Sequence, residues 1–452
     1  MKMWQKSLVY VAPTIGWWLL AAPLAVLGGI YAKYFGLSLT TIGTVMLVAR
    51  LSDALTDPLV GYYSDRQRSR TGTRKPLILT GAIALVPCSY FLLVPPEGVS
   101  IVYFIVWYMA FYLALTLFAI PYMAWANEFT ETSEDKTLVF SMAGIVGSVG
   151  GAMFYVLPLL PFFVTTEITP QILKASVLLG ALILVPGIFL ALKFVPSGPA
   201  HQPLAQTEGE PVATLAQQVK ALLVALYHNK PFVILMLTVM CSGIGTGMWL
   251  GLFFIFVDTF LNLGPQFAEL SVWGMVMGAV AIPIWYRLAI RWGKRRTWLV
   301  GMAMFVLLFF GTGLLQPGAE GFYKLFALNM LMTFASGSGS VVLAPMLCDT
   351  IDYGRLKDGA ERSAVYFAMN GLMVKAQLAV GGAIGFMLVG WFGFDMQATE
   401  QTPLGITGMR LSVAWIPMFF MVAAMFLIAR MPLTEERMKI VRRRLKMRDE
   451  RL

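Results

Sequence analysis

Three ionisable residues lie in the middle of an apolar stretch near the N-terminus. Arg50, Asp53 and Asp57 are spaced by three and then four residues, so an α-helix of about 3.6 residues per turn places all three on one face. In the middle of a membrane helix each ionisable group costs roughly 2.5–3.5 kcal/mol. A structural Arg–Asp pair between helices is one explanation. The other, which we favour, is a cation or proton site made by the two carboxylates, with Arg50 as partner or gate.

The composition of the chain is that of a membrane protein. Of its 452 residues 58% are hydrophobic and only 13% are charged, which is more apolar than a soluble globular protein. Stretches long enough to cross about 30 Å of hydrocarbon recur about twelve times, and lipid favours helices because their backbone groups are satisfied internally. We therefore predict an all-α polytopic membrane protein. The predicted spans are 8–32, 41–63, 76–95, 100–128, 138–163, 173–195, 231–262, 267–290, 297–316, 322–352, 363–392 and 408–431.

The net charge of +10 comes from loops on one side of the predicted membrane. The connection at 64–75 carries basic residues at 66, 68, 70, 74 and 75, whereas the loops on the opposite side carry mostly Asp and Glu. This is the bias of the positive-inside rule, not a nucleic-acid-binding surface. It predicts an inner-membrane protein with both termini in the cytoplasm.

A basic turn is repeated about half a chain apart. Arg70-x-Gly72-x-Arg74-Lys75 follows the second span, and Arg291-x-Gly293-x-Arg295-Arg296 follows the eighth. The glycines permit tight backbone, and the basic side chains can hold the cytoplasmic ends of neighbouring helices. A repeat at this distance divides the twelve helices into two six-helix pseudo-repeats.

The repeat and the loop composition define four predicted regions. These are an N-terminal six-helix half (1–196), a linker (197–230), a C-terminal six-helix half (231–431) and a basic tail (432–452). In the linker, apolar residues at helical spacing predict an interfacial amphipathic helix that tethers the halves. In the tail, Met438, Val441 and Leu445 share one side of a basic segment, which we expect to lie on the anionic cytoplasmic leaflet.

Further polar residues in or near the spans are candidates for coupling and gating. Lys375 lies near the middle of the eleventh span, where a lone ammonium must lose its proton or find a carboxylate. It either pairs with Asp53 or Asp57 in the other half or reaches a water-filled vestibule. Residues at the ends of the fourth and tenth spans are interpreted as cytoplasmic gates: Asn127, Glu128, Asp349 and Asp352.

Aromatic residues of the N-terminal half could contact a solute. They could stack on a sugar or an apolar ligand, although most such rings only pack or lie at the membrane interface. The candidates are Trp18, Tyr108, Tyr112, Tyr122 and Trp125.

Enzymatic chemistry is not indicated. The three cysteines lie in apolar stretches without CxxC spacing, and the two histidines fall in the linker region, so neither a disulfide framework nor a zinc site is predicted. The spans contain no nucleophile–base constellation. We expect no cofactor beyond a coupling ion, and no metal beyond Na⁺.

Four stretches resemble the glycoside–pentoside–hexuronide:cation symporters of the major facilitator superfamily, the melibiose-permease relatives. The stretches are DALTDPLVGYYSDRQRSRTGTRKP, IPYMAWANEFTETSEDKT, NKPFVILML and CDTIDYGRLKDGAERSAVYFAMNGLMVK, and they are spread over both halves. The resemblance implies a twelve-helix fold, alternating access and coupling to Na⁺, Li⁺ or H⁺.

The resemblance also implies roles for individual residues. Asp53 and Asp57 would be the cation carboxylates, Thr116 would add a hydroxyl, and Thr56 replaces an Asn of the melibiose carrier. Lys375 would match the eleventh-helix lysine.

Three positions depart from the family pattern. The melibiose carrier holds its sugar with charged residues where this chain has Trp18, Ala119 and Met142. Buried sugar hydroxyls need polar partners, so we expect no tight binding of melibiose-type disaccharides. Trp18 and Met142 remain candidates for substrate contact.

These observations predict a cation-coupled secondary symporter that works as a monomer, with a small-molecule solute, Na⁺ or H⁺ and membrane lipids as its partners. Family resemblance places a glycoside or related carbohydrate first. The alternatives are an amphipathic or lipid-like solute, and an uncoupled facilitator or receptor in which Asp53 and Asp57 are structural.

Overall fold

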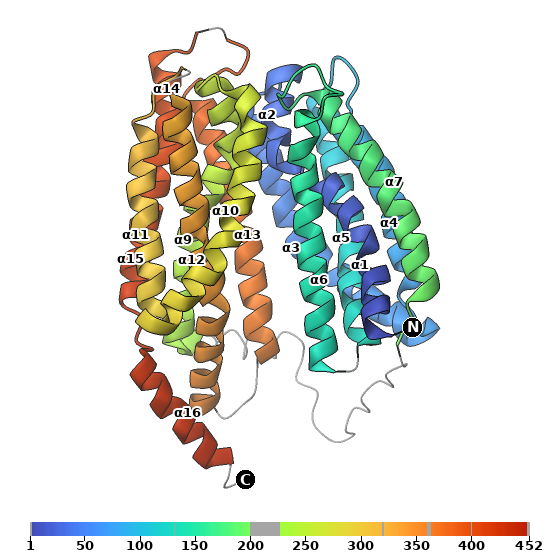
Figure 1. Ribbon diagram of the computed structural model, residues 1–452, viewed down its shortest axis with the longest axis vertical. Coiled ribbons are helices and arrows are strands. Elements are labelled where there is room, and N and C mark those ends of the chain that lie inside the picture. The colour runs from blue at the N-terminus through green and yellow to red at the C-terminus, as the bar shows by residue number, and fades with distance from the viewer. Residues whose placement is uncertain are drawn as a thin grey trace.

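A computed structural model describes residues 2–130, 132–198, 227–318, 321–358, 363–398 and 400–449. Within these residues 12 helical segments are long and apolar enough to cross a membrane, which confirms the predicted all-α fold and number of spans. Figure 1 shows two helical bundles side by side, with both chain termini toward the same end of the molecule. We call that end the termini end and the opposite one the far end.

The N-terminal half contains six spans. α1 and α2 form one span that is interrupted at Pro23, because proline lacks the N–H that a continuous helix needs. The helix α3 is 33 residues long and carries Arg50, Asp53 and Asp57. The helices are α1 (Met3–Ala21), α2 (Leu24–Phe35), α3 (Leu39–Thr71), α4 (Lys75–Leu93), α5 (Ile101–Phe129), α6 (Ser133–Val156) and α7 (Pro170–Phe194).

The C-terminal half contains the other six spans and the tail helix. A π-helical turn, Phe256–Phe260, continues α9, and another, Leu411–Trp415, joins α14 to α15. The predicted linker helix falls within residues 199–226, which lie outside the described part of the chain. The helices are α9 (Lys230–Ile255), α10 (Phe267–Trp292), α11 (Lys294–Gly313), α12 (Gly321–Asp358), α13 (Ser363–Trp391), α14 (Pro403–Arg410), α15 (Ile416–Ala429) and α16 (Glu435–Asp449).

The two halves meet along three pairs of helices. α3, α2 and α6 of the N-terminal half pack against α13, α9 and α10, respectively. Close approach depends on glycine: a Cβ atom at Gly43 would lie 2.8 Å from Cβ of Phe386, and one at Gly28 would lie 2.5 Å from its ring. Small residues let membrane helices approach closely. The α3–α13 contact brings the acidic pair of α3 near Lys375.

Helix α3 extends further than the apolar pattern predicted. The sequence placed its end at residue 63 and a loop at 64–75, but the helix continues to Thr71 and the turn is confined to the next few residues. Helical hydrogen bonding needs no apolar side chains, so the hydropathy boundary is not the backbone boundary. The helix ends where Gly72 adopts a left-handed conformation with φ +74°, a common helix terminator.

The tail helix packs on the protein itself. Met438, Val441 and Leu445, which the sequence assigned to the lipid leaflet, are at most 7% exposed and belong to the hydrophobic core. Helix α16 contacts α12. The sequence pattern identified the apolar side of the helix correctly, but a partner surface of the same protein covers that side.

The left-handed Gly72 gives a first testable prediction. A Cβ atom there would meet nothing within 4 Å, so Gly72→Ala pays only the cost of a left-handed conformation, roughly 1–2 kcal/mol. We expect the unfolding midpoint of the purified protein to fall. Gly61→Ala is the matched control, because Gly61 lies in the same helix and also has nothing within 4 Å. The control should leave the midpoint unchanged or raise it. Equal effects of the two substitutions would contradict the argument.

Candidate functional site

Asp57 of α3 connects the two halves of the protein. Its Oδ1 accepts a hydrogen bond of 3.0 Å from Thr116 Oγ1 in α5, and its Oδ2 forms an ion pair with Lys375 Nζ in α13. The Asp57 side chain is 21% exposed and that of Lys375 is 62% exposed. Lys375 is thus exposed to open space and also paired with a carboxylate. The sequence analysis treated the carboxylate pair and the exposed position as alternatives.

Asp53 has a different partner from Asp57. Its Oδ2 lies 3.4 Å from Nη1 of Arg50, one helical turn earlier. Arg50 also donates a 2.7 Å hydrogen bond to the Tyr112 hydroxyl, and its guanidinium lies 4.1 Å from the ring centroid of Tyr112. The position of Arg50 is therefore fixed by α5. Its pair with Asp53 lies within α3, so it is not the pair between helices that the sequence suggested as one explanation.

Besides Arg50 and Lys375, the polar side chains of this region are carboxylates and hydroxyls, which offer oxygen atoms as ligands. The Thr116 hydroxyl lies beside the Asp57 carboxylate, Asp53 lies one helical turn before Asp57 in α3, and Thr56 precedes Asp57 directly. Hard cations take oxygen ligands, so these side chains could hold a small cation or a proton. Their roles as ion ligands stay a prediction.

A second ion pair joins the halves near the far end, and the sequence analysis did not single it out. Lys33 of α2 donates to both carboxylate oxygens of Asp258, at 2.9 and 2.8 Å, and lies 3.7 Å from Glu167. The Asp258 side chain is only 2% exposed. A lysine in the last turn of an apolar span was the available signal, but its partner lies 225 residues away.

The backbone around Asp258 is shaped to accommodate this pair. Asp258 belongs to the π-helical turn that continues α9, and such turns occur frequently at functional sites. A Cβ atom at Gly264 would lie 2.6 Å from Asp258 Oδ1, so a larger residue there would displace the carboxylate. The Gln397 amide donates to the Lys33 carbonyl at 3.3 Å.

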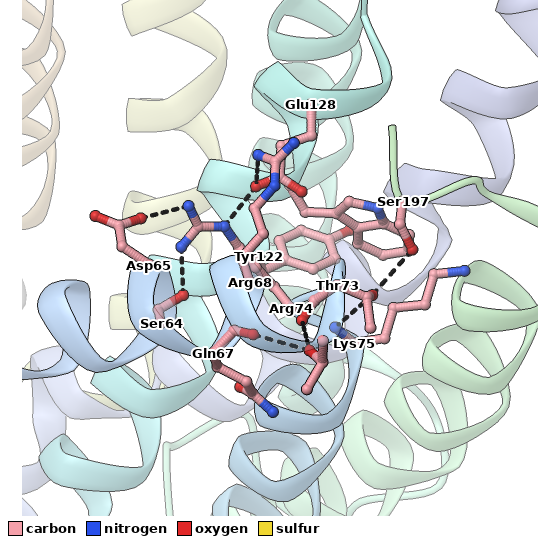
Figure 2. Close-up of polar contacts among 12 residues, drawn as sticks. Ser64, Asp65, Gln67, Arg68, Thr73, Arg74, Lys75, Tyr122, Glu128 and Ser197 are labelled. Atoms are coloured by element: carbon pink, nitrogen blue, oxygen red, sulfur yellow. Dashed lines mark hydrogen bonds and ion pairs between the residues drawn. The ribbon is translucent and has the colours of Figure 1, made fainter. Parts of the chain in front are cut away.

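The first basic turn forms an ion-pair cluster at the termini end of the N-terminal half (Figure 2). Arg74 binds Glu128 at the end of α5, Ser64 Oγ at 2.6 Å and Asp65 near the end of α3. Arg68 pairs with the same Glu128. Burial acts to lower the pKa of Arg74, but its bonds to Glu128 and Asp65 outweigh that effect and raise the pKa above its usual value.

Lys75 extends this cluster to a fourth helix. Its Nζ donates to the carbonyls of Leu192 and Val195, both at 2.7 Å, at the C-terminal end of α7. A cation is favourable there because the last carbonyls of a helix carry partial negative charge. The basic turn thus holds the ends of α3, α5 and α7 together within one half.

The second basic turn uses a different residue of the repeat. Lys294, not Arg295, pairs with Asp349 of α12, while Arg295 donates to the Met431 carbonyl at 3.3 Å. Gly293 has a positive φ, as Gly72 does, but its ψ is 154° against 0° at Gly72, so the two turns differ in backbone conformation. The tail supplies a second cation, because Arg442 of α16 lies 2.9 Å from Asp349 and 3.8 Å from Asp352.

The residues predicted as gates form ion pairs inside their own halves. Glu128 pairs within the N-terminal half, and Asp349 and Asp352 pair within the C-terminal half. The side chain of Asn127 lies outside the described residues. A gating role for these four residues stays a prediction.

The aromatic candidates divide into two groups. Tyr108, Tyr112 and Trp125 are at most 4% exposed and pack in the hydrophobic core. Trp18 and Tyr122 line a cavity of about 420 Å³, together with Met275 of the C-terminal half. Met142 is partly buried against the core and is not among the residues that line this cavity. Substrate contact by any of the six candidates stays a prediction.

Two known relatives are similar to this chain over nearly their whole length. The glucuronide carrier protein homolog of Escherichia coli (strain K12) is 25% identical over 419 residues, which cover 90% of this chain and 88% of the relative. The putative glycoside/cation symporter YagG of the same organism is 24% identical over 435 residues, which cover 94% and 90%, respectively.

Solved structures share the fold. The nucleoside transporter NupG matches with a TM-score of 0.65 at 15% identity, covering 96% of this chain and 100% of NupG. The inward-open xylose transporter XylE from E. coli matches with a TM-score of 0.60 at 17% identity, covering 96% and 97%. Residues 10–435 match the family model described as MFS/sugar transport protein. Because that match covers nearly the whole chain, the protein belongs to this family of membrane transporters.

Proposed function

We propose that this protein is a secondary symporter that couples Na⁺ or H⁺ to the uptake of a glycoside or related carbohydrate. One observation carries the proposal: the intramembrane carboxylate of Asp57 meets Thr116 of its own half and Lys375 of the other half. The family match and the names of the relatives, a glucuronide carrier homolog and a putative glycoside/cation symporter, support the solute class. The transporter acts as a monomer in the inner membrane.

Coupling arises because a cation and Lys375 compete for the same carboxylate. When Na⁺ or H⁺ neutralises Asp57, the ammonium of Lys375 loses its partner across the α3–α13 contact. A ligand shifts a conformational equilibrium only when it binds the two states differently, and this competition supplies such a difference. Asp53, Thr56 and Thr116 provide further oxygen ligands. Coupling ions bind near the membrane midplane, between the repeats, in transporters of this kind.

Alternating access requires contacts between the halves that form at one end and break at the other. At the far end Lys33 pairs with Asp258 across the halves, which holds that end closed. At the termini end the ion pairs of Glu128 and of Asp349 stay within each half. We assign the termini end to the cytoplasm, because the basic connections lie there.

An amphipathic solute is the second candidate. The cavity beside Trp18 is lined mainly by apolar and aromatic residues, including Trp17, Met123 and Phe140. An apolar chain would bury its surface there at a gain of about 25 cal/mol per Å². The charged residues of the melibiose carrier, which would hold a sugar, are absent from the matching positions of this chain.

The first functional prediction concerns the cation. We expect the melting temperature of the purified protein to rise saturably with Na⁺, Li⁺ or H⁺, because a ligand that binds the folded state stabilises it. Asp57→Asn should raise the cation concentration needed for half of this response at least about tenfold, which corresponds to about 1.4 kcal/mol of binding free energy. Asp65→Asn, on the same helix, is the control and should keep the response. A response unchanged by Asp57→Asn would show that the cation binds elsewhere, and the absence of any response in the unmodified protein would support an uncoupled facilitator.

The second prediction concerns the pair between the halves. Lys375→Ala leaves Asp57 without its cation, and adding Asp57→Asn removes the unpaired charge, so the double variant should be more stable than the sum of single effects. We expect an interaction of about 0.5–3 kcal/mol in a double-mutant cycle on unfolding, toward the lower end because Lys375 is largely exposed. The same cycle with Asp53, which pairs with Arg50, should be closer to additive. Additivity for Asp57 would show that Lys375 only lines a wet space.

The third prediction concerns the far end. Lys33→Met leaves the buried Asp258 carboxylate beside Glu167 without a cation, and an unpaired buried charge is strongly unfavourable. We expect the far end to open, seen as a longer distance between spin labels at Glu97 and Pro317 in a background without the native cysteines. The charge swap Lys33→Asp with Asp258→Lys should restore part of the short-distance population. Lys174→Met, an exposed lysine near the same end, is the control. An unchanged distance in Lys33→Met would exclude a closing role.

A further inference from the structure

An open groove of about 520 Å³ lies at the termini end of the C-terminal half, where α10, the second basic turn, α12 and the start of α16 meet. Its lining has two chemically different parts. Along the spans it is apolar, with Ile290 of α10 and Val341 and Pro345 of α12. Next to the turn it is charged, with three basic side chains and one carboxylate: Arg291, Lys294, Lys439 and Glu435.

Two of the three cations in this groove have no counter-ion. Lys294 pairs with Asp349 and lies 3.9 Å from Glu435, so its charge is balanced by the protein. Arg291 and Lys439 are exposed, and the described residues form no hydrogen bond or ion pair with either side chain. The charged part of the groove therefore suits an anion that bridges these two residues.

The tail helix brings the second cation to the groove. A Cβ atom at Gly293 would lie 3.3 Å from Cγ of Glu435, and the Lys294 N–H donates to Glu435 Oε1 at 3.5 Å. The start of α16 therefore rests on the second basic turn at the termini end (Figure 1). Lys439 follows Glu435 by four residues, about one helical turn, and so lies on the same face of α16.

An exposed apolar strip leads along α10 into the groove. Ile282, Tyr286 and Ile290 are spaced by four residues and are 51%, 59% and 66% exposed. Trp292, beside the basic turn, is also exposed. Aromatic side chains are enriched where a membrane span meets the headgroup layer, and an exposed apolar face on a span suits acyl chains.

We propose that this groove binds an anionic phospholipid, with the phosphate between Arg291 and Lys439 and an acyl chain along the apolar strip of α10. A free anion would use only the charged part of the groove, whereas a phospholipid matches both parts. The termini end, assigned above to the cytoplasm, faces the leaflet in which anionic lipids attract basic segments. The proposal does not depend on the transported solute.

The headgroup preference is tested by thermal unfolding of the purified full-length protein in detergent micelles at constant Na⁺. We expect phosphatidylglycerol to raise the melting temperature saturably, because a ligand of the folded state stabilises it. Phosphatidylcholine with the same acyl chains should have a much smaller effect, and inorganic phosphate none. Equal effects of the two lipids would overturn the proposal. An effect of inorganic phosphate as large as that of phosphatidylglycerol would also overturn it, in favour of a site for free anions.

A double variant tests the location of the site. Arg291→Gln with Lys439→Gln should raise the phosphatidylglycerol concentration needed for half of the response at least about tenfold, because each basic residue near the headgroup adds to the attraction. Without added lipid its melting temperature should stay unchanged, since both side chains are exposed and unpaired among the described residues.

The control is Arg70→Gln with Arg443→Gln, which also removes two positive charges. Arg70 occupies the position of Arg291 in the first basic turn, Arg443 lies one turn after Lys439 in α16, and neither lines the groove. The control should keep the phosphatidylglycerol response. Equal losses in the two double variants would show attraction by overall surface charge, and no loss in either would place the lipid elsewhere. Both results would overturn the proposal.

A charge-conserving exchange separates binding from folding. Arg291→Lys with Lys439→Arg keeps both cations in the groove and should keep the response to phosphatidylglycerol. Loss of the response in this variant, at an unchanged melting temperature without lipid, would contradict recognition by charge. Should the double glutamine variant fail to fold, Arg291→Gln and Lys439→Gln are measured singly. Each should then raise the half-response concentration about threefold or more, and an unchanged value in both would overturn the proposal.

Discussion

The high cost of an unpaired charge in a low-dielectric interior governs the centre of this protein. Asp57 lies in the middle of a membrane span, and Lys375 of the other half is its cation. The pair forms where α3 and α13 approach closely, which Gly43 of α3 permits beside Phe386 of α13. Asp57 is the more buried of the two partners, at 21% against 62% exposed, and its carboxylate is costly to leave unpaired. Whatever neutralises Asp57 therefore changes the free energy of the contact between the halves.

Ion pairs at three depths have different structural consequences. Lys33–Asp258 at the far end and Lys375–Asp57 in the middle join the two halves. The clusters around Arg74 and Asp349 at the termini end bind helices within one half. Pairs within a half make it a rigid unit, and pairs between halves define how two rigid units meet, as alternating access requires.

The two halves are related by a repeat but are not equivalent. In the N-terminal half, Glu128 pairs with Arg68 of α3 and with Arg74 of the turn that follows α3. In the C-terminal half, Asp349 pairs with Lys294 of α11 and with Arg442 of the tail helix α16. A cavity between α9, α12 and α13 of the C-terminal half has hydroxyl and amide groups, whereas the cavity beside Trp18 is mainly aromatic. The repeated sequence motif therefore does not imply that the two halves have the same ion pairs or the same kind of cavity.

The amino-acid sequence was enough to predict the twelve spans and to single out Asp57 and Lys375 as candidate coupling residues. Long apolar runs are unfavourable in water, and charged side chains are unfavourable in lipid. Both can therefore be recognised from the sequence alone. The partner of each charge is visible only once the helices are packed: Asp53 pairs with Arg50, Asp57 with Lys375, and Lys33 with Asp258. The same holds for the continuation of α3 to Thr71 and for the contact of α16 with α12. Pairs between residues hundreds of positions apart depend on helix packing and on glycine contacts between distant segments. Hydropathy and spacing along the chain do not show which distant residues lie close together in space.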